Sequence, residues 1–124
     1  MRRKIRIKID PLDKLVSEYV RKASGGICAR CLKNVGWKSL QCCHFHGRAK
    51  KSVRWDIDNL AACCFGCHQY LDSHPLEKVE FWKQRLGETN FHLLNARARQ
   101  TERPDKELLT LYFTQKLKEL VEVS

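Results

Sequence analysis

The sequence of 124 residues lacks any apolar stretch near the ~20 residues that a helix needs to cross a membrane. Its basic start, Met1-Arg2-Arg3-Lys4-Ile5-Arg6, has no apolar segment after it and so does not form a secretory signal. These absences predict a protein with no membrane partner, and we expect it in the cytoplasm.

Internal repeats, low-complexity tracts and a glycine-rich phosphate loop are also missing. Acidic residues are few: 14 Asp and Glu stand against 24 Lys and Arg, which leaves a formal net charge of +10. Such a basic chain favours a polyanionic partner, most simply nucleic acid. Its length suits one domain better than two, so we predict a single domain over residues 1–124.

What the sequence does have is seven cysteines, four of them in two Cys-x-x-Cys pairs. This odd number and grouping fit metal binding in a reducing compartment better than a set of disulfides. Two such turns can present four thiolates at ~2.3 Å from one tetrahedral Zn²⁺. We therefore predict a structural Zn²⁺ held by Cys28, Cys31, Cys64 and Cys67. Cys63 could replace Cys64 but has the wrong spacing from Cys67, and Cys42 is expected to be a small core residue.

Three polar residues lie among these cysteines: His44, Asn59 and His68. A neutral imidazole can take a proton from water, which makes His44 a candidate general base. The amide of Asn59 could bond backbone groups across a loop, or simply cap a turn after Asp58. His68 and Asp72 would share one face of a helix and could bind a divalent ion, although Asp72 could instead cap a turn.

A basic loop follows His44 and could neutralise DNA phosphates, with Trp55 packed beneath it. Its cations are Arg48, Lys50, Lys51 and Arg54. A solvated charged face is the plainer alternative. On a regular strand His46 would point to the same side as His44 and could contact phosphate, assist a metal or lie at the rim. A second phosphate-contact patch could come from Arg97, Arg99 and Arg103.

Hydrophobic periodicity places helices on both sides of a metal-dense centre at about residues 27–72. Alternation over residues 3–9 could be a short strand or a basic arm. Asp10-Pro11 is typical of a helix start and predicts a helix over about 11–24. Within the centre we expect a strand from Leu40 to His46 and helical backbone from about His68.

Amphipathic helices are predicted over about 75–123. The first, Pro75 to Leu86, would bury Leu76, Val79, Trp82 and Leu86. Thr89 could cap the next, which runs to about Gln100. The last spans Glu107 to Val123 with an apolar stripe expected to be core or a dimer seam, so that an oligomer could form through it: Leu108, Leu111, Tyr112, Leu117 and Leu120.

The run Cys28-x2-Cys31…His44…Asn59…Cys64-x2-Cys67-His68 resembles the HNH endonucleases, which have a ββα-metal (His-Me finger) fold. Among these it looks most like small phage and prophage proteins of the NinG type. That likeness rests on His44-Phe45-His46-Gly47-Arg48 and Arg54-Trp55-Asp56-Ile57-Asp58-Asn59 and covers roughly residues 12–100.

The resemblance implies an α+β fold: a ββα-metal core with a four-cysteine zinc knot and flanking α-helices. It implies hydrolysis of phosphodiester bonds in DNA, by nicking or with a preference for DNA structure, leaving 5′-phosphate and 3′-hydroxyl ends. The setting would be phage or prophage recombination or DNA processing, in the cytoplasm of a bacterial host.

The resemblance also assigns roles: His44 the general base, Asn59 the loop-orienting residue, and His68 with Asp72 ligands of a catalytic ion such as Mg²⁺, Mn²⁺ or Ni²⁺. Cys43 stands where related nucleases commonly carry Asp or His, so Cys43 or His46 could be a further ligand. Cysteine is a poor ligand for Mg²⁺ and suits a softer metal.

Two other functions fit parts of the pattern. A non-catalytic zinc module that binds DNA or a protein partner would need the cysteines and the charge but not His44. A zinc nucleic-acid deaminase would need His-x-Glu and Pro-Cys-x-x-Cys, and neither motif is present here.

Overall fold

The structure is a computed structural model that describes residues 7–123, with side chains to residue 121. Within this range it is an α+β protein of five α-helices and one two-stranded antiparallel sheet, as predicted. The alternating segment 3–9 lies mostly outside the described residues. Among the described helices, all are too short or too polar to cross a bilayer.

Helix α1, Pro11–Ala23, begins as the sequence predicted. Asp10 is the N-cap and accepts the backbone N–H of Leu12 at 2.9 Å, while the Asp13 carboxylate accepts the N–H of Asp10 at 2.7 Å. This reciprocal capping satisfies donors that the first helical turn would otherwise leave unpaired. The helix buries Leu12 and Val16 against the rest of the chain.

The sheet pairs β1, Leu40–His44, with β2, Leu60–Cys64, and its register sets Leu40 opposite Cys64 and His44 opposite Leu60. β1 ends two residues before the predicted His46, because the Phe45 N–H already bonds the Asn59 carbonyl at 2.9 Å and the chain then turns away. Helix α2, Phe65–Ser73, follows β2 directly and begins three residues before the expected His68.

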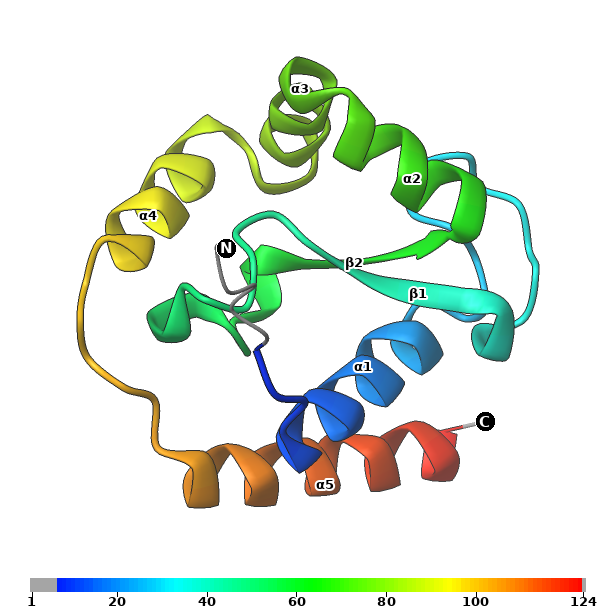
Figure 1. Cartoon of the computed structure of the whole chain (residues 1–124). Coiled ribbons are helices and arrows are strands. Elements are labelled where there is room, and N and C mark those ends of the chain that lie inside the picture. The colour runs from blue at the N-terminus through cyan, green and yellow to red at the C-terminus, as the bar shows by residue number, and fades with distance from the viewer. Residues whose placement is uncertain (1–6, 124) are drawn as a thin grey trace, which may run out of the picture.

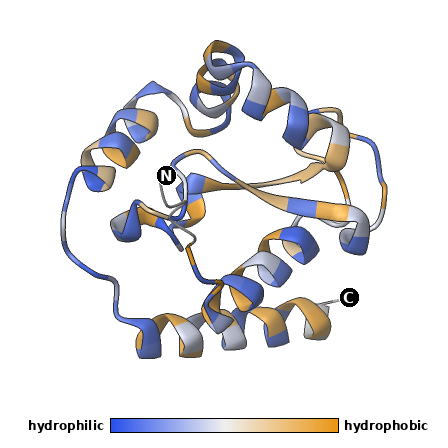
Figure 2. Cartoon of the chain, in the orientation of Figure 1, coloured by the Kyte–Doolittle hydropathy of each residue, from blue (hydrophilic) through white to orange (hydrophobic). Residues whose placement is uncertain are grey.

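The helices cover both faces of this hairpin (Figure 1): α2 and α3 lie over one face, and α1 and α5 over the other. β2 is apolar along its length (Figure 2), as expected for a strand covered on both faces. Two apolar clusters result, one around Trp82 and Leu94 beneath α2 and α3, the other around Val16 and Phe113 between α1 and α5.

Helix α3, Pro75–Leu86, has the predicted bounds, and α4 spans Glu88–Ala98. Trp82 is buried as predicted, but Leu76 is 84% exposed because it lies in the first turn, beyond the edge of the core. Thr89 does not cap α4. Its N-cap is Gly87, whose φ of +80° suits glycine and lets α3 and α4 meet without a longer loop.

Part of the apolar stripe predicted for α5, Lys106–Val123, does not face the core, and the alternative of a dimer seam stays a prediction. Leu109 and Phe113 face α1, and the Phe113 ring lies 5.6 Å from that of Tyr19. Three side chains assigned to the stripe are exposed instead: Leu108, Leu111 and Tyr112. This rotation of α5 brings Phe113 into the apolar cluster that contains Leu12 and Val16 of α1.

An ion pair far apart in sequence joins α1 to the basic loop. The Asp13 carboxylate accepts from Arg54 Nε at 2.9 Å and Nη2 at 2.5 Å, and from the Trp55 indole at 2.8 Å. Burial raises the pKa of Asp13, but the bonds from Arg54, the backbone of Asp10 and Trp55 outweigh it and hold that pKa below its usual value. The side chain of Arg54 is 8% exposed, so this is a buried pair.

Replacing Asp13 by asparagine should destabilise the protein by roughly 3–5 kcal/mol, since the buried guanidinium loses its charge partner. Because the pKa is depressed in the folded state, the Asp13 contribution is present above about pH 4 and disappears as the pH falls through the folded-state pKa. Urea unfolding at pH 7 and at lower pH measures both effects. Glu18→Gln, which breaks only an exposed pair with Lys22, is the matched control. Equal losses in the two variants would contradict the assignment.

Candidate metal centres and catalytic cleft

The first candidate site is the four-cysteine cluster, made of the two Cys-x-x-Cys turns. Cys28 and Cys31 lie in a tight turn after α1, closed by a bridge between Ile27 and Asn34. Cys64 ends β2 and Cys67 lies in the first turn of α2. Hairpin and helix therefore bring the second pair to the turn that holds the first.

All four sulfur atoms of this cluster lie within 4.8 Å of one another. The Cys31 and Cys64 sulfurs are 3.9 Å apart. Two thiolates ~2.3 Å from one tetrahedral ion stand roughly 3.8 Å apart, so the spacing fits Zn²⁺. The cluster could therefore hold a metal ion such as zinc, as the sequence predicted.

The backbone around the cluster favours a thiolate at Cys28. Burial raises the pKa of Cys28, but backbone hydrogen bonds, among them the Cys64 N–H at 3.3 Å, bring it down to about 6. Arg30 donates to the Cys67 sulfur at 3.5 Å and lies 4.1 Å from the ring centroid of Tyr70. Burial and the neighbouring cysteines raise the pKa of Cys67 to about 12, although Arg30 lowers it. A bound metal ion would supply the positive charge that a thiolate there needs.

A second cluster also includes residues of α2. Cys43, His68 and Asp72 offer ligand atoms within 4.8 Å of one another. His68 and Asp72 are four residues apart on α2, and His68 Nε2 lies 3.3 Å from Asp72 Oδ2. Cys43 is fully buried on β1, while the Asp72 side chain is 53% exposed. The cluster is therefore closed to solvent at Cys43 on β1 and accessible to solvent at Asp72 on α2.

Of the two further ligands considered from the sequence, only Cys43 lies in this cluster. His46 Nε2 instead hydrogen-bonds Asn95 Oδ1 on α4 at 2.8 Å. A hydrogen bond to Cys43 lowers the pKa of that thiol, and its donor is the buried Cys63 on the neighbouring strand. The pKa of Cys63 itself is raised, so it remains the protonated partner.

His44 and His68 line one shared cleft of about 840 Å³, between α1 and the outer end of β1. Its charged lining is four cations and two carboxylates, so cations predominate: Lys14, Arg21, Lys38 and Arg48 with Asp13 and Glu18. Burial lowers the pKa of His44, and the charge of Arg48 lowers it further. The imidazole of His44 is therefore uncharged at neutral pH and able to accept a proton.

Asn59 is fully buried and clamps the chain immediately beyond His44. Its Oδ1 accepts the N–H of His46 at 2.7 Å and its Nδ2 donates to the His46 carbonyl at 2.9 Å. This pair of bonds is the loop-bridging arrangement that the sequence suggested for this amide. The position of His44 is consequently held by its strand on one side and by Asn59 on the other.

The basic loop divides into exposed and internal cations. Lys50 and Lys51 are exposed and Arg48 is half-buried beside the cleft, but Arg54 is buried against Asp13 and the Lys8 carbonyl. Arg54 therefore has a structural position rather than one open to phosphate. Arg97, expected in a second patch, similarly pairs with Asp56 at 2.7 Å and Asp58 at 3.1 Å.

Trp55, as expected, packs under the loop, but Asp13 and Asn95 were not identified from the sequence. Asp13 carried a usable signal as the acidic residue at the third position of a capped helix. Asn95 carried none, since its partner His46 is 49 residues away.

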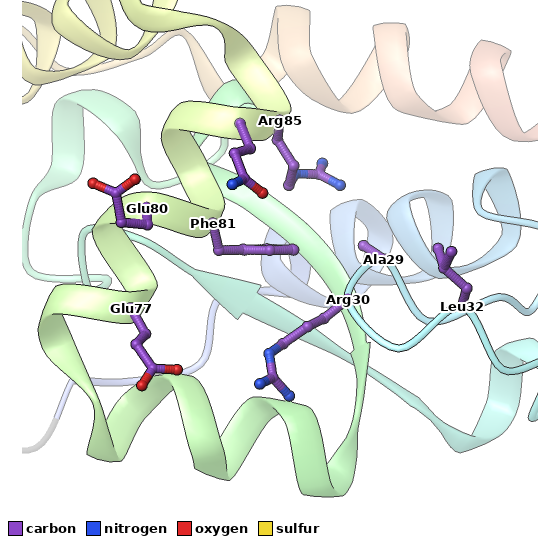
Figure 3. A pocket seen from close by; sticks show the side chains of 8 residues that line it. Ala29, Arg30, Leu32, Glu77, Glu80, Phe81 and Arg85 are labelled. Atoms are coloured by element: carbon purple, nitrogen blue, oxygen red, sulfur yellow. The ribbon is translucent and has the colours of Figure 1, made fainter.

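A smaller hollow of about 470 Å³ lies between the first cysteine turn and α3 (Figure 3). Its lining mixes Arg30 and Arg85 with Glu77 and Glu80, so it has no strong charge of one sign. His44 and His68 line the other cleft, on the α1 side, whereas Cys43 and Asp72 are not among its lining residues.

No protein-family model, curated protein or solved structure matches this chain, so the argument for its function depends on the geometry of these residues.

Proposed function

We propose that the protein is a metal-dependent DNA endonuclease of the HNH type, built on a ββα-metal core formed by β1, β2 and α2. The observation that carries the proposal is the meeting of His44 and His68 in one cationic cleft, with Cys43 and Asp72 gathered at His68. His68 belongs both to the cleft that His44 lines and to the cluster with Cys43 and Asp72, which supports a base and a cation acting on one phosphate.

In this proposal His44 takes a proton from the water that attacks phosphorus, as its uncharged imidazole permits. Asn59 keeps the backbone beyond His44 in place. A divalent ion held by His68, Asp72 and Cys43 would supply stabilisation of the charge developing on the phosphate and the departing 3′ oxygen. The bond from phosphorus to the 3′ oxygen breaks, which leaves a 5′-phosphate and a 3′-hydroxyl.

The charge distribution supports DNA as the substrate. The net charge is +10, Arg48 lines the cleft, and Lys50 and Lys51 are exposed in the same basic loop, which supports contact with phosphates. Contacts to phosphate position a duplex but do not read its sequence. We therefore expect weak sequence preference, and nicking by a single protomer, in DNA processing or recombination of a phage or prophage.

A plasmid-nicking assay tests the proposal. Supercoiled plasmid should convert to open circles in the presence of at least one of Mg²⁺, Mn²⁺, Co²⁺ and Ni²⁺. It should remain supercoiled in EDTA. The matched control is the same preparation after heat unfolding. Any nicking that remains in it comes from the metal alone and not from the folded protein. Intact plasmid under every metal would overturn the nuclease function.

A non-catalytic zinc module that binds DNA is the second candidate. The four-cysteine cluster and the exposed cations of the basic loop favour it equally, because neither depends on His44. Tight, salt-sensitive DNA binding without nicking under any metal would select this function instead.

A further inference from the structure

Every member of the second cluster is held by a neighbour that is not itself a candidate ligand. His68 Nδ1 lies 2.6 Å from Gln41 Oε1 on β1. An amide oxygen can only accept, so Nδ1 donates to it. Nε2 is then the ring atom left to face Asp72, at 3.3 Å, and it is the atom that could bind an ion there.

Asp72 is restricted in the same way. Lys78 on α3 binds Asp72 Oδ1 at 2.8 Å, and only Oδ2 faces His68. The carboxylate therefore offers one oxygen to an ion rather than two. The Lys78 side chain is 16% exposed, so this is a partly sheltered pair and not a chance surface contact.

Cys43 supplies the third donor from a fully buried position, where its sulfur accepts a hydrogen bond from Cys63. The donor set is thus one sulfur, one imidazole nitrogen and one carboxylate oxygen. Mg²⁺ prefers oxygen ligands in octahedral geometry and binds thiolate poorly, whereas Zn²⁺ and Co²⁺ accept sulfur, nitrogen and oxygen.

One donor-to-donor distance is compatible with a tetrahedral ion. Two ligands ~2.05 Å from a tetrahedral ion stand roughly 3.3 Å apart, and around an octahedral ion roughly 2.9 Å. His68 Nε2 and Asp72 Oδ2 are 3.3 Å apart. Three protein ligands and one open position form the usual arrangement of a catalytic rather than a structural zinc site.

We infer that Cys43, His68 and Asp72 form a thiolate-containing site for Zn²⁺ or Co²⁺ that Mg²⁺ does not occupy, with Gln41 as a positioning residue for His68. The catalytic meaning of this site rests on the proposed function, but the site can be tested without DNA.

Cobalt titration tests it. Protein carrying one equivalent of zinc in the four-cysteine cluster should bind a further equivalent of Co²⁺ with a sulfur-to-cobalt charge-transfer band and the strong visible bands of tetrahedral cobalt. Zinc content measured afterwards shows whether cobalt has entered the first site. A thousandfold excess of Mg²⁺ should leave the spectrum unchanged. A spectrum without a sulfur band, or its loss on adding Mg²⁺, would overturn the inference.

Variants assign the band to its residues. Cys43→Asp should remove the charge-transfer band and let Mg²⁺ compete, whereas Cys42→Ala, its neighbour on the opposite face of β1, should keep the band. Because Cys43 is fully buried and its replacement could prevent folding, Asp72→Asn provides a second route at an exposed carboxylate. Asp72→Asn should weaken Co²⁺ binding at least ~10-fold while the band returns at saturation. Unchanged affinity in Asp72→Asn would count against the site.

Gln41 is exposed, so its replacement should not disturb the core. Gln41→Ala should weaken Co²⁺ binding about 10-fold or more, as loss of an orienting partner does, and Gln41→Glu should restore it. A purely structural role would leave cobalt affinity unchanged in both variants. The nicking assay separates the two proposals. The expected cobalt spectrum without nicking would rule out the nuclease function. Nicking with Mg²⁺ as the only added metal, while the second site is empty, would rule out the metal assignment.

Discussion

Replacing Cys31 by serine should unfold the protein, although the Cys31 side chain is exposed and contributes little to the core. An exposed Cys→Ser change ordinarily costs within about 0.5 kcal/mol. A structural zinc ion, however, contributes roughly 10–16 kcal/mol of apparent binding free energy in small zinc peptides. That exceeds or equals the stability of most domains, which is about 5–15 kcal/mol. The same effect should follow from a strong chelator.

Circular dichroism melting and metal analysis measure this result. The wild type should contain one tightly held zinc equivalent and melt cooperatively, and Cys31→Ser should lose both properties. Cys42→Ala is the control, because Cys42 is a half-buried free cysteine on β1 that lies outside the four-cysteine cluster. An unchanged melting curve and zinc content in Cys31→Ser would refute the zinc site.

His44→Ala should reduce plasmid nicking by ~10²-fold or more, the usual loss when a general base is removed. The fold should survive, because β1 is held by its pairing with β2 and the chain beyond His44 by Asn59. DNA affinity should also survive, since the exposed cations of the basic loop are unchanged. The change therefore separates chemistry from binding.

Initial nicking rates and gel-shift affinities measure this outcome at one salt concentration, because phosphate contacts weaken steeply with salt. His92→Ala is a matched control on the exposed face of α4 and should nick at the wild-type rate. Full activity in His44→Ala would remove His44 from the catalytic site while leaving the metal clusters intact.

Features with local signals were predictable from the sequence. Asp10-Pro11 marks the start of α1 because capping and the fixed φ of proline act within one turn. The spacing of the Cys-x-x-Cys pairs identified all four members of the first cluster, because a metal knuckle is itself a local turn. His68 and Asp72 share a face through the period of one helix.

Features that depend on partners distant in the sequence could not be predicted from the sequence. Both Leu108–Leu111 and Leu109–Phe113 could be the apolar face of α5, and the α1 surface decides between them. Arg54 has the local character of a phosphate contact, but Asp13, 41 residues earlier, takes it into the interior. The choice between Cys43 and His46 likewise needed the position of Asn95. Charge and periodicity indicate which contacts a residue can make, while the tertiary structure decides which of these contacts form.

Cys67 and His68 are consecutive residues of α2, yet one belongs to the four-cysteine cluster and the other to the cluster at Cys43. The buried Leu71 packs α2 into the core, while Cys64 and Cys67 anchor its first turn. With zinc in the first cluster, that turn would be held with His68 in position, so loss of zinc should also weaken binding of a second ion. In a cell short of zinc, newly made chains would then accumulate without either centre, and zinc supply would control how much working protein exists.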